Sequence, residues 1–262
     1  MFPARLRVIT AAVVGLATAA GAVSALAASP VPNWGGPPPP PPPAIAAASV
    51  GKAMNVVLNV NGQASALLNQ VMASGSSMRA RYSQKNSVPT YTKTTAFKGG
   101  VTLASNGRTL TSIANATAVS TSGQRTSNGM ASIGAIGLTV KNGSAVLMTL
   151  TSTRLSSHAS FLESTAGVHK PSGSASMAGV TINSTAFGAK NVKFSGPAPA
   201  NKVLFHNADH SVVIFANRQT ITSRNGKPAK ITVDAILVQF TKFKNAGKTI
   251  SGNVELAASV AR

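Results

Sequence analysis

The sequence of 262 residues contains no cysteine, four acidic residues and a single tryptophan. Without cysteine, the chain has neither a disulfide framework nor thiol chemistry. The acids are Glu163, Asp209, Asp234 and Glu255. Together with four histidines they are a poor supply for catalysis, because general acid–base chemistry relies on positioned titratable groups. We therefore expect a protein that is not an enzyme and that carries no cofactor.

The motifs of common catalytic sites are also missing. No Gly-x-Ser-x-Gly segment provides a nucleophile elbow. Glycine is plentiful, with 23 residues, but no glycine-rich loop opens a helix where its backbone could cradle a phosphate. These absences strengthen the expectation of a non-catalytic protein.

Titratable side chains gather only in the segment His206-Asn-Ala-Asp-His210. Residues four apart share a face of a helix or a strand. His206 and His210 could therefore ligate a metal, with Asp209 as a further ligand or as a hydrogen-bond partner behind them. The spacing matches no established metal site, so a polar turn is the favoured interpretation. A metal-dependent enzyme is the third-ranked hypothesis.

Residues 1–27 have the features of a secretory signal peptide. Arg5 and Arg7 form a basic start, residues 8–23 are apolar, and Ala25-Leu26-Ala27 supplies the small residues of a cleavage site. Cleavage after Ala27 leaves no transmembrane span and predicts an exported protein that is secreted, periplasmic or at the cell surface. An uncleaved membrane anchor is the alternative.

A proline-rich segment follows at residues 28–44. Pro37–Pro43 is an unbroken proline run, which adopts the extended polyproline II conformation without internal hydrogen bonds. At about 3.1 Å per residue the run spans roughly 20 Å, so we interpret it as a semi-rigid spacer. Residues 45–262 are then the folded, β-rich domain.

The composition and patterning of residues 45–262 indicate pleated sheet. Small and β-branched residues dominate, and these suit strands better than helices. Alternating apolar segments end at turn signals, namely Asn61-Gly62, Asn106-Gly107, Asn225-Gly226 and Asn245–Gly247. The fold class is predicted to be all-β, a mostly antiparallel β-sandwich, with a β-solenoid as the alternative. One short helix is expected near residues 64–73, where apolar residues have helical spacing.

A hairpin is predicted within residues 128–153. Apolar residues alternate with small ones in Ile136–Val140, the turn signal Lys141–Gly143 follows, and a second apolar segment comes next. A three-residue loop with a left-handed Gly143 pairs Leu138 with Val146 and keeps the apolar side chains on one face. A two-residue turn is the alternative if the second strand is buried on both faces.

The C-terminal third has the pattern of an antiparallel meander. Apolar segments begin at Val212, Ile231 and Ile250, and turn signals separate them. Two stretches in this part, Ile231–Val238 and Gly252–Ser259, are similar to segments of the choice-of-anchor P family of bacterial proteins. That resemblance implies an exported, β-rich protein with a role at the cell surface and without known catalysis.

Charge is the most unusual feature of the composition. Twenty-four lysines and arginines against four acids give a net charge of +20. Removal of residues 1–27 leaves twenty-two basic residues against four acids, a net charge of +18. Such a field attracts polyanions, including nucleic acid, lipopolysaccharide and anionic polysaccharide. Solubility, or adaptation to an acidic exterior, is the alternative explanation of the charge.

One segment resembles a polyanion-binding patch. Arg79, Arg81, Lys85 and Lys93 are interleaved with tyrosines, an arrangement that can hold a phosphate backbone and stack bases. A solvated loop is the alternative, since no nucleic-acid-binding motif is present.

The leading hypothesis is a non-catalytic secreted or envelope-associated protein, structural or adhesive, with a strongly basic surface. A polyanion-binding module is the second. The expected partners are anionic envelope polymers or another surface protein.

Overall fold

The computed structural model describes residues 47–262, apart from residues 65–67, 78–80, 118–123 and 165. The predicted signal peptide (1–27) and the proline-rich spacer (28–44) lie outside the described residues. In the part of the chain that is described, no helix is long and apolar enough to cross a membrane.

The described residues form strands and no helix. The strands are β1 (Ala47–Val60), β2 (Gln63–Ala64), β3 (Leu68–Ser77), β4 (Arg81–Phe97), β5 (Val101–Thr117), β6 (Arg125–Asn142), β7 (Ala145–Ser152), β8 (Arg154–Glu163), β9 (His169–Asn183), β10 (Val192–Pro197), β11 (Lys202–His206), β12 (Val212–Arg224), β13 (Lys227–Asn245) and β14 (Lys248–Ala261).

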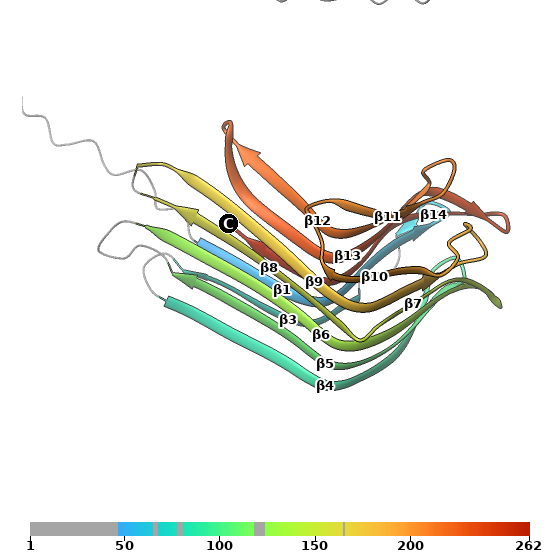
Figure 1. Ribbon diagram of the computed structural model, residues 1–262. Coiled ribbons are helices and arrows are strands. Elements are labelled where there is room, and N and C mark those ends of the chain that lie inside the picture. Colours follow the sequence, from blue (N-terminus) through green and yellow to red (C-terminus); the bar gives the residue numbers. More distant parts are fainter. Residues whose placement is uncertain (1–46, 65–67, 78–80, 118–123, 165) are drawn as a thin grey trace, which may run out of the picture. The chain divides into compact units, whose positions relative to one another are not determined.

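These strands pair into two antiparallel sheets (Figure 1). Sheet A has the order β11-β12-β13-β14-β1-β2, with β3 also paired to β1. Sheet B has the order β10-β9-β7-β6-β5-β4, with β8 paired to β6 and β9. The prediction of an all-β, antiparallel sandwich is confirmed, including the C-terminal meander β12-β13-β14. A solenoid, which stacks parallel strands, is excluded.

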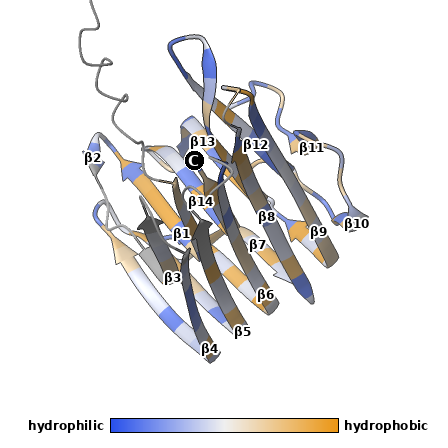
Figure 2. Ribbon diagram, turned by 90° about the vertical axis from the view of Figure 1, so that its left-hand side faces the viewer, coloured by the Kyte–Doolittle hydropathy of each residue, from blue (hydrophilic) through white to orange (hydrophobic). Residues whose placement is uncertain are grey.

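The hydrophobic core lies between the two sheets. Leu58 and Val254 of sheet A are completely buried there, as are Leu103 and Leu138 of sheet B. Figure 2 shows apolar and polar positions alternating along the strands, as expected when one face of each sheet is buried. Burial of each such leucine contributes about 2 kcal/mol to stability.

Glycine allows the two sheets to approach closely at one point. A Cβ atom on Gly51 of β1 would lie 2.1 Å from the carbonyl oxygen of Met130. A Cβ atom on Gly129 of β6 would lie 2.4 Å from the carbonyl oxygens of Val50 and Val260. No side chain fits in these gaps, so the two backbones are in direct contact.

In the long strands of both sheets, the set of alternate residues that faces the core changes near the middle of the strand. In β13, Ile231, Val233 and Ala235 are buried, and then Ile236 and Val238 take their place. Ala235 and Ile236 are therefore consecutive residues that both face the core, and the change between the two sets occurs there. The same change of parity occurs in neighbouring strands, so the ladder of hydrogen bonds continues on both sides of it.

In sheet A the reversal positions face one another in a line across the strands, which we call the crease of sheet A. Its residues are Val71 in β3, Ala53 in β1, Ala257 in β14, Ala235 in β13 and Asn217 in β12. Positive φ angles of 48°, 48° and 49° occur at Val71, Ala257 and Asn217, which lie on alternate strands. One left-handed residue turns the backbone and restarts the alternation.

Sheet B has an equivalent crease. It passes through Pro89 in β4, Thr109 in β5, Gly134 in β6, Thr153 between β7 and β8, and Gly179 in β9. Thr109 and Gly179 have φ angles of 52° and 58°. Figure 1 shows that the strands of both sheets bend near their middle and in the same direction.

The predicted hairpin is formed by β6 and β7. The favoured three-residue loop is wrong, since Leu138 pairs with Leu150 and not with Val146. The alternative, a two-residue turn, is correct in length. Asn142 pairs with Ala145, so the turn contains two residues, Gly143 and Ser144. The expected left-handed conformation of Gly143 is confirmed by its φ of 62°. A bulge at Leu147 then restores the parity that keeps most apolar side chains of β7 on the core side.

The helix expected near residues 64–73 is wrong. Residues 63–64 form β2 and residues 68–77 form β3, while residues 65–67 lie outside the described part. The pairing of β3 with β1 determines the conformation of this segment. This long-range pairing overrides the local apolar spacing of three and four that is typical of helices.

The turn signals were correct with one exception. Turns occur at Asn61-Gly62, Asn225-Gly226 and Ala246-Gly247. Asn106-Gly107 instead lies inside β5, where Gly107 pairs with residues of β4 and β6 on either side.

We expect the crease of sheet B to depend on Gly179. Its φ is 58°, and a Cβ atom there would lie 2.8 Å from Thr153 Oγ1. Gly179→Ala should lower the free energy of unfolding by about 2 kcal/mol, from left-handed strain and crowding together. Urea unfolding would measure this loss.

The control for this variant is Gly226→Ala. Gly226 also has a positive φ, 75°, but nothing lies within 4 Å of its added Cβ. The free energy of unfolding of Gly226→Ala should fall by about 1 kcal/mol, because only the strain of the left-handed backbone contributes. Equal losses of stability in the two variants would show that the contact between residue 179 and Thr153 is unimportant.

Candidate functional site

A cleft of about 940 Å³ lies where the tip of the β12–β13 hairpin approaches the ends of β6, β8 and β9. We call it the basic cleft. Its charged lining consists of Arg125, Glu163, Arg224, Lys227, Lys230 and Arg262. Five cationic side chains therefore surround one carboxylate side chain, and His169 and the buried Phe161 complete the wall beside them.

The floor of the basic cleft is held by an ion pair. Arg125 of β6 pairs with Glu163 of β8, directly opposite in the sheet. Only 14% and 25% of these two side chains are exposed. Salt therefore screens their attraction less than it would screen that of a fully exposed pair. Glu163 is thereby neutralised and does not offset the remaining cations of the cleft.

His169 connects this floor to the hairpin above it. Its Nδ1 donates a hydrogen bond to the carbonyl oxygen of Pro228, at 2.7 Å. Its Nε2 lies 3.9 Å from Glu163 Oε1, and the edge of its ring packs against Phe161, with 5.8 Å between ring centroids. These contacts fix the hairpin over the end of sheet B and give the cleft a defined shape.

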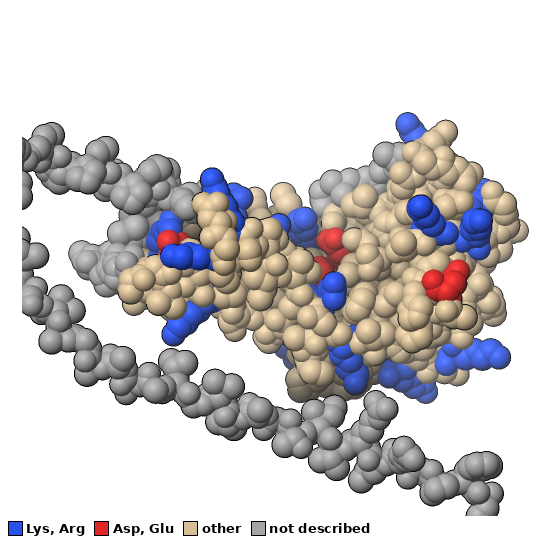
Figure 3. Space-filling model, turned by 90° about the horizontal axis from the view of Figure 1, so that it is seen from above, with Lys and Arg blue, Asp and Glu red and all other residues tan. Residues whose placement is uncertain are grey.

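The rim of the basic cleft carries cations without acidic partners. Within the described residues, no ion pair joins Arg224, Lys227, Lys230 or Arg262 to an acid. Figure 3 shows basic side chains gathered around an acidic one at the left of the view. Unpaired cations at the edge of a concave surface focus a positive potential into it, and such a site attracts anions.

The structure places the predicted metal-binding residues in the turn between β11 and β12. The rings of His206 and His210 stack, with centroids 4.3 Å apart. Asp209 Oδ1 accepts a hydrogen bond from the backbone N–H of Ser211, at 3.0 Å, and this bond lowers the pKa of the Asp209 carboxyl. Among the described residues, no three histidine or acidic side chains are grouped closely enough to hold a metal.

The structure describes the side chains of two of the four residues in the predicted basic patch. Arg79 and the side chain of Arg81 lie outside the described part of the chain. Lys85 and Lys93 are exposed on β4, but they lie on either side of Pro89, where the crease of sheet B reverses the faces of the strand. They therefore project from opposite faces of sheet B.

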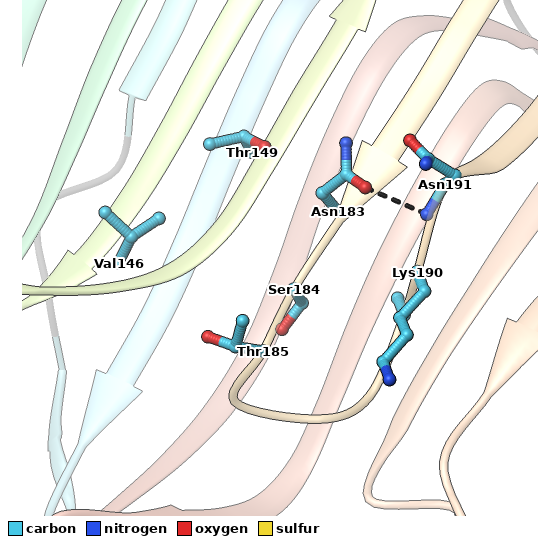
Figure 4. Close-up of a pocket in the computed structure, with 8 residues that line it drawn as sticks. Val146, Thr149, Asn183, Ser184, Thr185, Lys190 and Asn191 are labelled. Carbon is cyan, nitrogen blue, oxygen red and sulfur yellow. Dashed lines mark hydrogen bonds between the residues drawn. The ribbon is translucent and has the colours of Figure 1, made fainter.

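A second concave region is smaller and nearly uncharged. A pocket of about 390 Å³ lies between β7 and the loop from β9 to β10 (Figure 4). The backbone N–H of Asn191 donates to Asn183 Oδ1 at 2.8 Å and closes the base of that loop. Lys190 is the one charged residue in its lining, so the pocket has little with which to hold an anion.

A cluster of charges on sheet A was not expected from the sequence. Asp234 of β13 is only 5% exposed. Burial, and then repulsion by Glu255, raise the pKa of Asp234 to about 8, against the opposing effect of Lys52 and Arg218. The available signal was an acid inside the apolar stretch Ile231–Val238, but its partners come from other strands.

No protein-family model, no curated protein and no solved structure matches this chain. The resemblance to the choice-of-anchor P family therefore stays a prediction. The basic cleft and the charge cluster on sheet A have to be interpreted from their own geometry and charge.

We expect Asp234 to reduce stability as the pH rises. Its pKa is about 3.9 in an unfolded chain and about 8 in the folded one. Between these values the folded state binds more protons, so the free energy of unfolding falls with pH, by up to about 1.4 kcal/mol per unit. Asp234→Asn, which cannot ionise, should remove most of this slope.

Urea unfolding of both proteins between pH 5 and pH 9 would check this expectation. The variant should be close to the wild type at pH 5 and more stable at pH 9. Asp209→Asn is the control, because that carboxylate is exposed and its pKa is lowered. Parallel pH profiles for wild type and Asp234→Asn would contradict the assignment.

Proposed function

We propose that this protein is a non-enzymatic binding protein of the cell exterior, and that it attaches to acidic polysaccharide through the basic cleft. The observation that carries the proposal is the convergence of five cations from separate parts of the chain on one concave surface. A chain of carboxylated or sulfated sugars presents negative charge at regular intervals, which suits several cations spaced along a rim.

The chemistry of the lining favours a polysaccharide over a nucleic acid. Proteins that hold single-stranded nucleic acid stack its bases on exposed aromatic rings. The described lining offers no well-exposed ring, because Phe161 is 5% exposed and the side chain of His169 is 18% exposed and packs against it. Thr222, Ser223 and Asn225 instead present hydroxyl and amide groups beside the cations, and these groups hydrogen-bond to sugar hydroxyls.

The titratable groups of the cleft are engaged in structural contacts, which supports a binding role without catalysis. Glu163 is paired with Arg125, and His169 donates its Nδ1 proton to the hairpin backbone. A catalytic acid or base has to exchange its proton with a substrate. Neither group is arranged to do so without first breaking the contacts that shape the cleft.

An external location agrees with two features of the sequence. Residues 1–27 have the organisation of a signal peptide, and the chain contains no cysteine that would need a reducing compartment. The resemblance to the choice-of-anchor P family supports a cell-surface role. The surplus of basic residues would draw the protein to anionic polymers of an envelope, and the cleft would then supply the specific contact.

Removal of three rim cations should weaken binding of polygalacturonate, a carboxylated polysaccharide. In the triple variant Arg224→Ser, Lys227→Ser, Arg262→Ser, we expect the dissociation constant at low salt to rise at least about tenfold. The slope of log affinity against log salt should fall by about two, because each lost contact releases roughly 0.7 to 0.9 fewer counterions. Calorimetric titrations at several salt concentrations would measure both.

The control removes the same charge elsewhere. Lys93, Lys141 and Lys193 are exposed and lie outside the basic cleft, and their change to serine should alter the affinity by less than about threefold. Equal losses in both triple variants would mean that net charge alone drives binding. Tighter binding of single-stranded DNA than of polygalacturonate would replace the proposal with a nucleic-acid function.

A further inference from the structure

The crease of sheet A brings together side chains that point away from the core. On either side of it, Asp234 of β13, Glu255 of β14 and Asn55 of β1 all face outward. Outward residues are normally exposed, yet only 5% of Asp234 and 6% of Asn55 are accessible. The outer face of sheet A is therefore concave at the crease, in agreement with the direction in which the strands bend (Figure 1).

Three side chains that carry oxygen atoms lie on this concave face, and two of them are in contact. Asn55 lies directly opposite Glu255 in the ladder of β1 and β14, and its Nδ2 donates a hydrogen bond of 2.7 Å to Glu255 Oε2. This bond orients the amide and leaves Asn55 Oδ1 as an acceptor. Asp234 faces the same side from β13, in the row that it forms with Ala258, and the crease separates this row from that of Glu255 and Asn55. Repulsion by Glu255 contributes to the raised pKa of Asp234.

Two of these oxygens are buried without a partner. Asn55 Oδ1 and Asp234 Oδ1 have no hydrogen-bond donor among the described residues. Buried polar atoms in folded proteins are almost always satisfied, and each exception calls for an explanation such as a functional ligand. Asn55 Oδ1 is an acceptor, and Asp234 Oδ1 is one when the carboxyl is ionised, above its pKa of about 8. In that state the partner that fits both atoms is a donor or a cation.

The nearby basic residues do not fill this role. Arg218 lies opposite Asp234 in β12, but its guanidinium stacks on Phe215, 4.7 Å from the ring centroid, and donates to Asn201 Oδ1 at 3.2 Å. Lys52 is separated from Asp234 by Ala258 in the same row of the sheet. Neither forms an ion pair with Asp234, so its carboxylate is open to another positive partner.

We propose that Asp234, Glu255 and Asn55 form a binding site for one divalent cation of the calcium type on the concave face of sheet A. Two carboxylates and an amide oxygen are hard ligands of the kind that calcium takes in proteins, and water completes its shell. Magnesium is a poorer fit, because it requires near-ideal octahedral geometry and gives up its water reluctantly.

The position of the site suggests what the cation does. Its ligands come from three adjacent strands of sheet A, β13, β14 and β1, and they lie on both sides of the crease. A cation bound there ties the two halves of the bent sheet together. It also neutralises the repulsion between Asp234 and Glu255. The site lies on sheet A and is separate from the residues that line the basic cleft.

Calcium should therefore stabilise the protein in a manner that depends on these residues. After treatment with a chelating resin, the protein would be titrated with CaCl₂ by calorimetry and melted at calcium concentrations up to about 10 mM, which covers the range of extracellular calcium modules. We expect one site per chain and a melting temperature that rises with calcium. MgCl₂ at the same concentration should produce a smaller shift.

Matched variants assign the site. Glu255→Gln and Asp234→Asn should each lower the affinity for calcium at least about tenfold, because each removes a charged ligand. Asp209→Asn removes an acid that lies in the β11–β12 turn and should leave the affinity unchanged. Lys52→Met should raise the affinity, since it removes a competing positive charge, and this variant keeps all three ligands in place.

The pH dependence provides a readout that a structural role of the acids would not give. Calcium competes with the proton of Asp234, whose pKa is about 8, while Glu255, Lys52 and Arg218 are the charged groups that face it. The affinity should rise by up to about tenfold per unit until pH 8 and then level off. The slope should disappear in Asp234→Asn.

Two outcomes would overturn the proposal. One is a melting temperature that does not change with calcium up to about 10 mM, the upper end for extracellular modules, at a pH above the pKa of Asp234. The other is a calcium effect that persists undiminished in Asp234→Asn and Glu255→Gln. Loss of stability in Lys52→Met without any gain in calcium affinity would instead identify Lys52 as the partner of Asp234.

Discussion

The reversal of strand faces at the two creases is the constraint on which the rest of the structure depends. In an ordinary strand one set of alternate residues faces the core throughout. Here left-handed residues exchange the two sets, on every second strand of sheet A and at Thr109 and Gly179 in sheet B. Neighbouring strands have to reverse at the same position or lose their ladder. The outer face of sheet A thereby becomes concave, and this concavity buries Asp234 and Asn55.

The scarcity of acids gives each of the four a traceable position. Asp209 is engaged by the backbone of a turn, Glu163 anchors the floor of the basic cleft, and Asp234 and Glu255 lie together at the crease of sheet A. Since so few acids are available, most basic residues have none to pair with. Five of these basic residues line the basic cleft together.

The sequence was sufficient to predict the fold class, the C-terminal meander and most Asn-Gly turns, because these depend on local alternation and on residues that tolerate positive φ. It failed at the creases. Two consecutive inward residues, such as Ala235 and Ile236, interrupt the period of two. The apolar spacing around Val71 was mistaken for a helix, because the pairing of β3 with β1 cannot be read from local spacing. The crease cluster could not be predicted, since Asn55 and Glu255 meet only through the register of β1 and β14.

The pairing of β1 with β14 also determines when the domain can fold. Ser49 lies opposite Ala261, so the first and last strands are neighbours in the middle of sheet A, where β14 also pairs with β13. Closing a loop of that length carries a large entropy penalty before any contact is gained, and folding rates fall as such distant contacts accumulate. Sheet A can therefore be completed only after β14 has been synthesised, more than 180 residues after β1. Until then β1 and β13 each lack the strand that joins them.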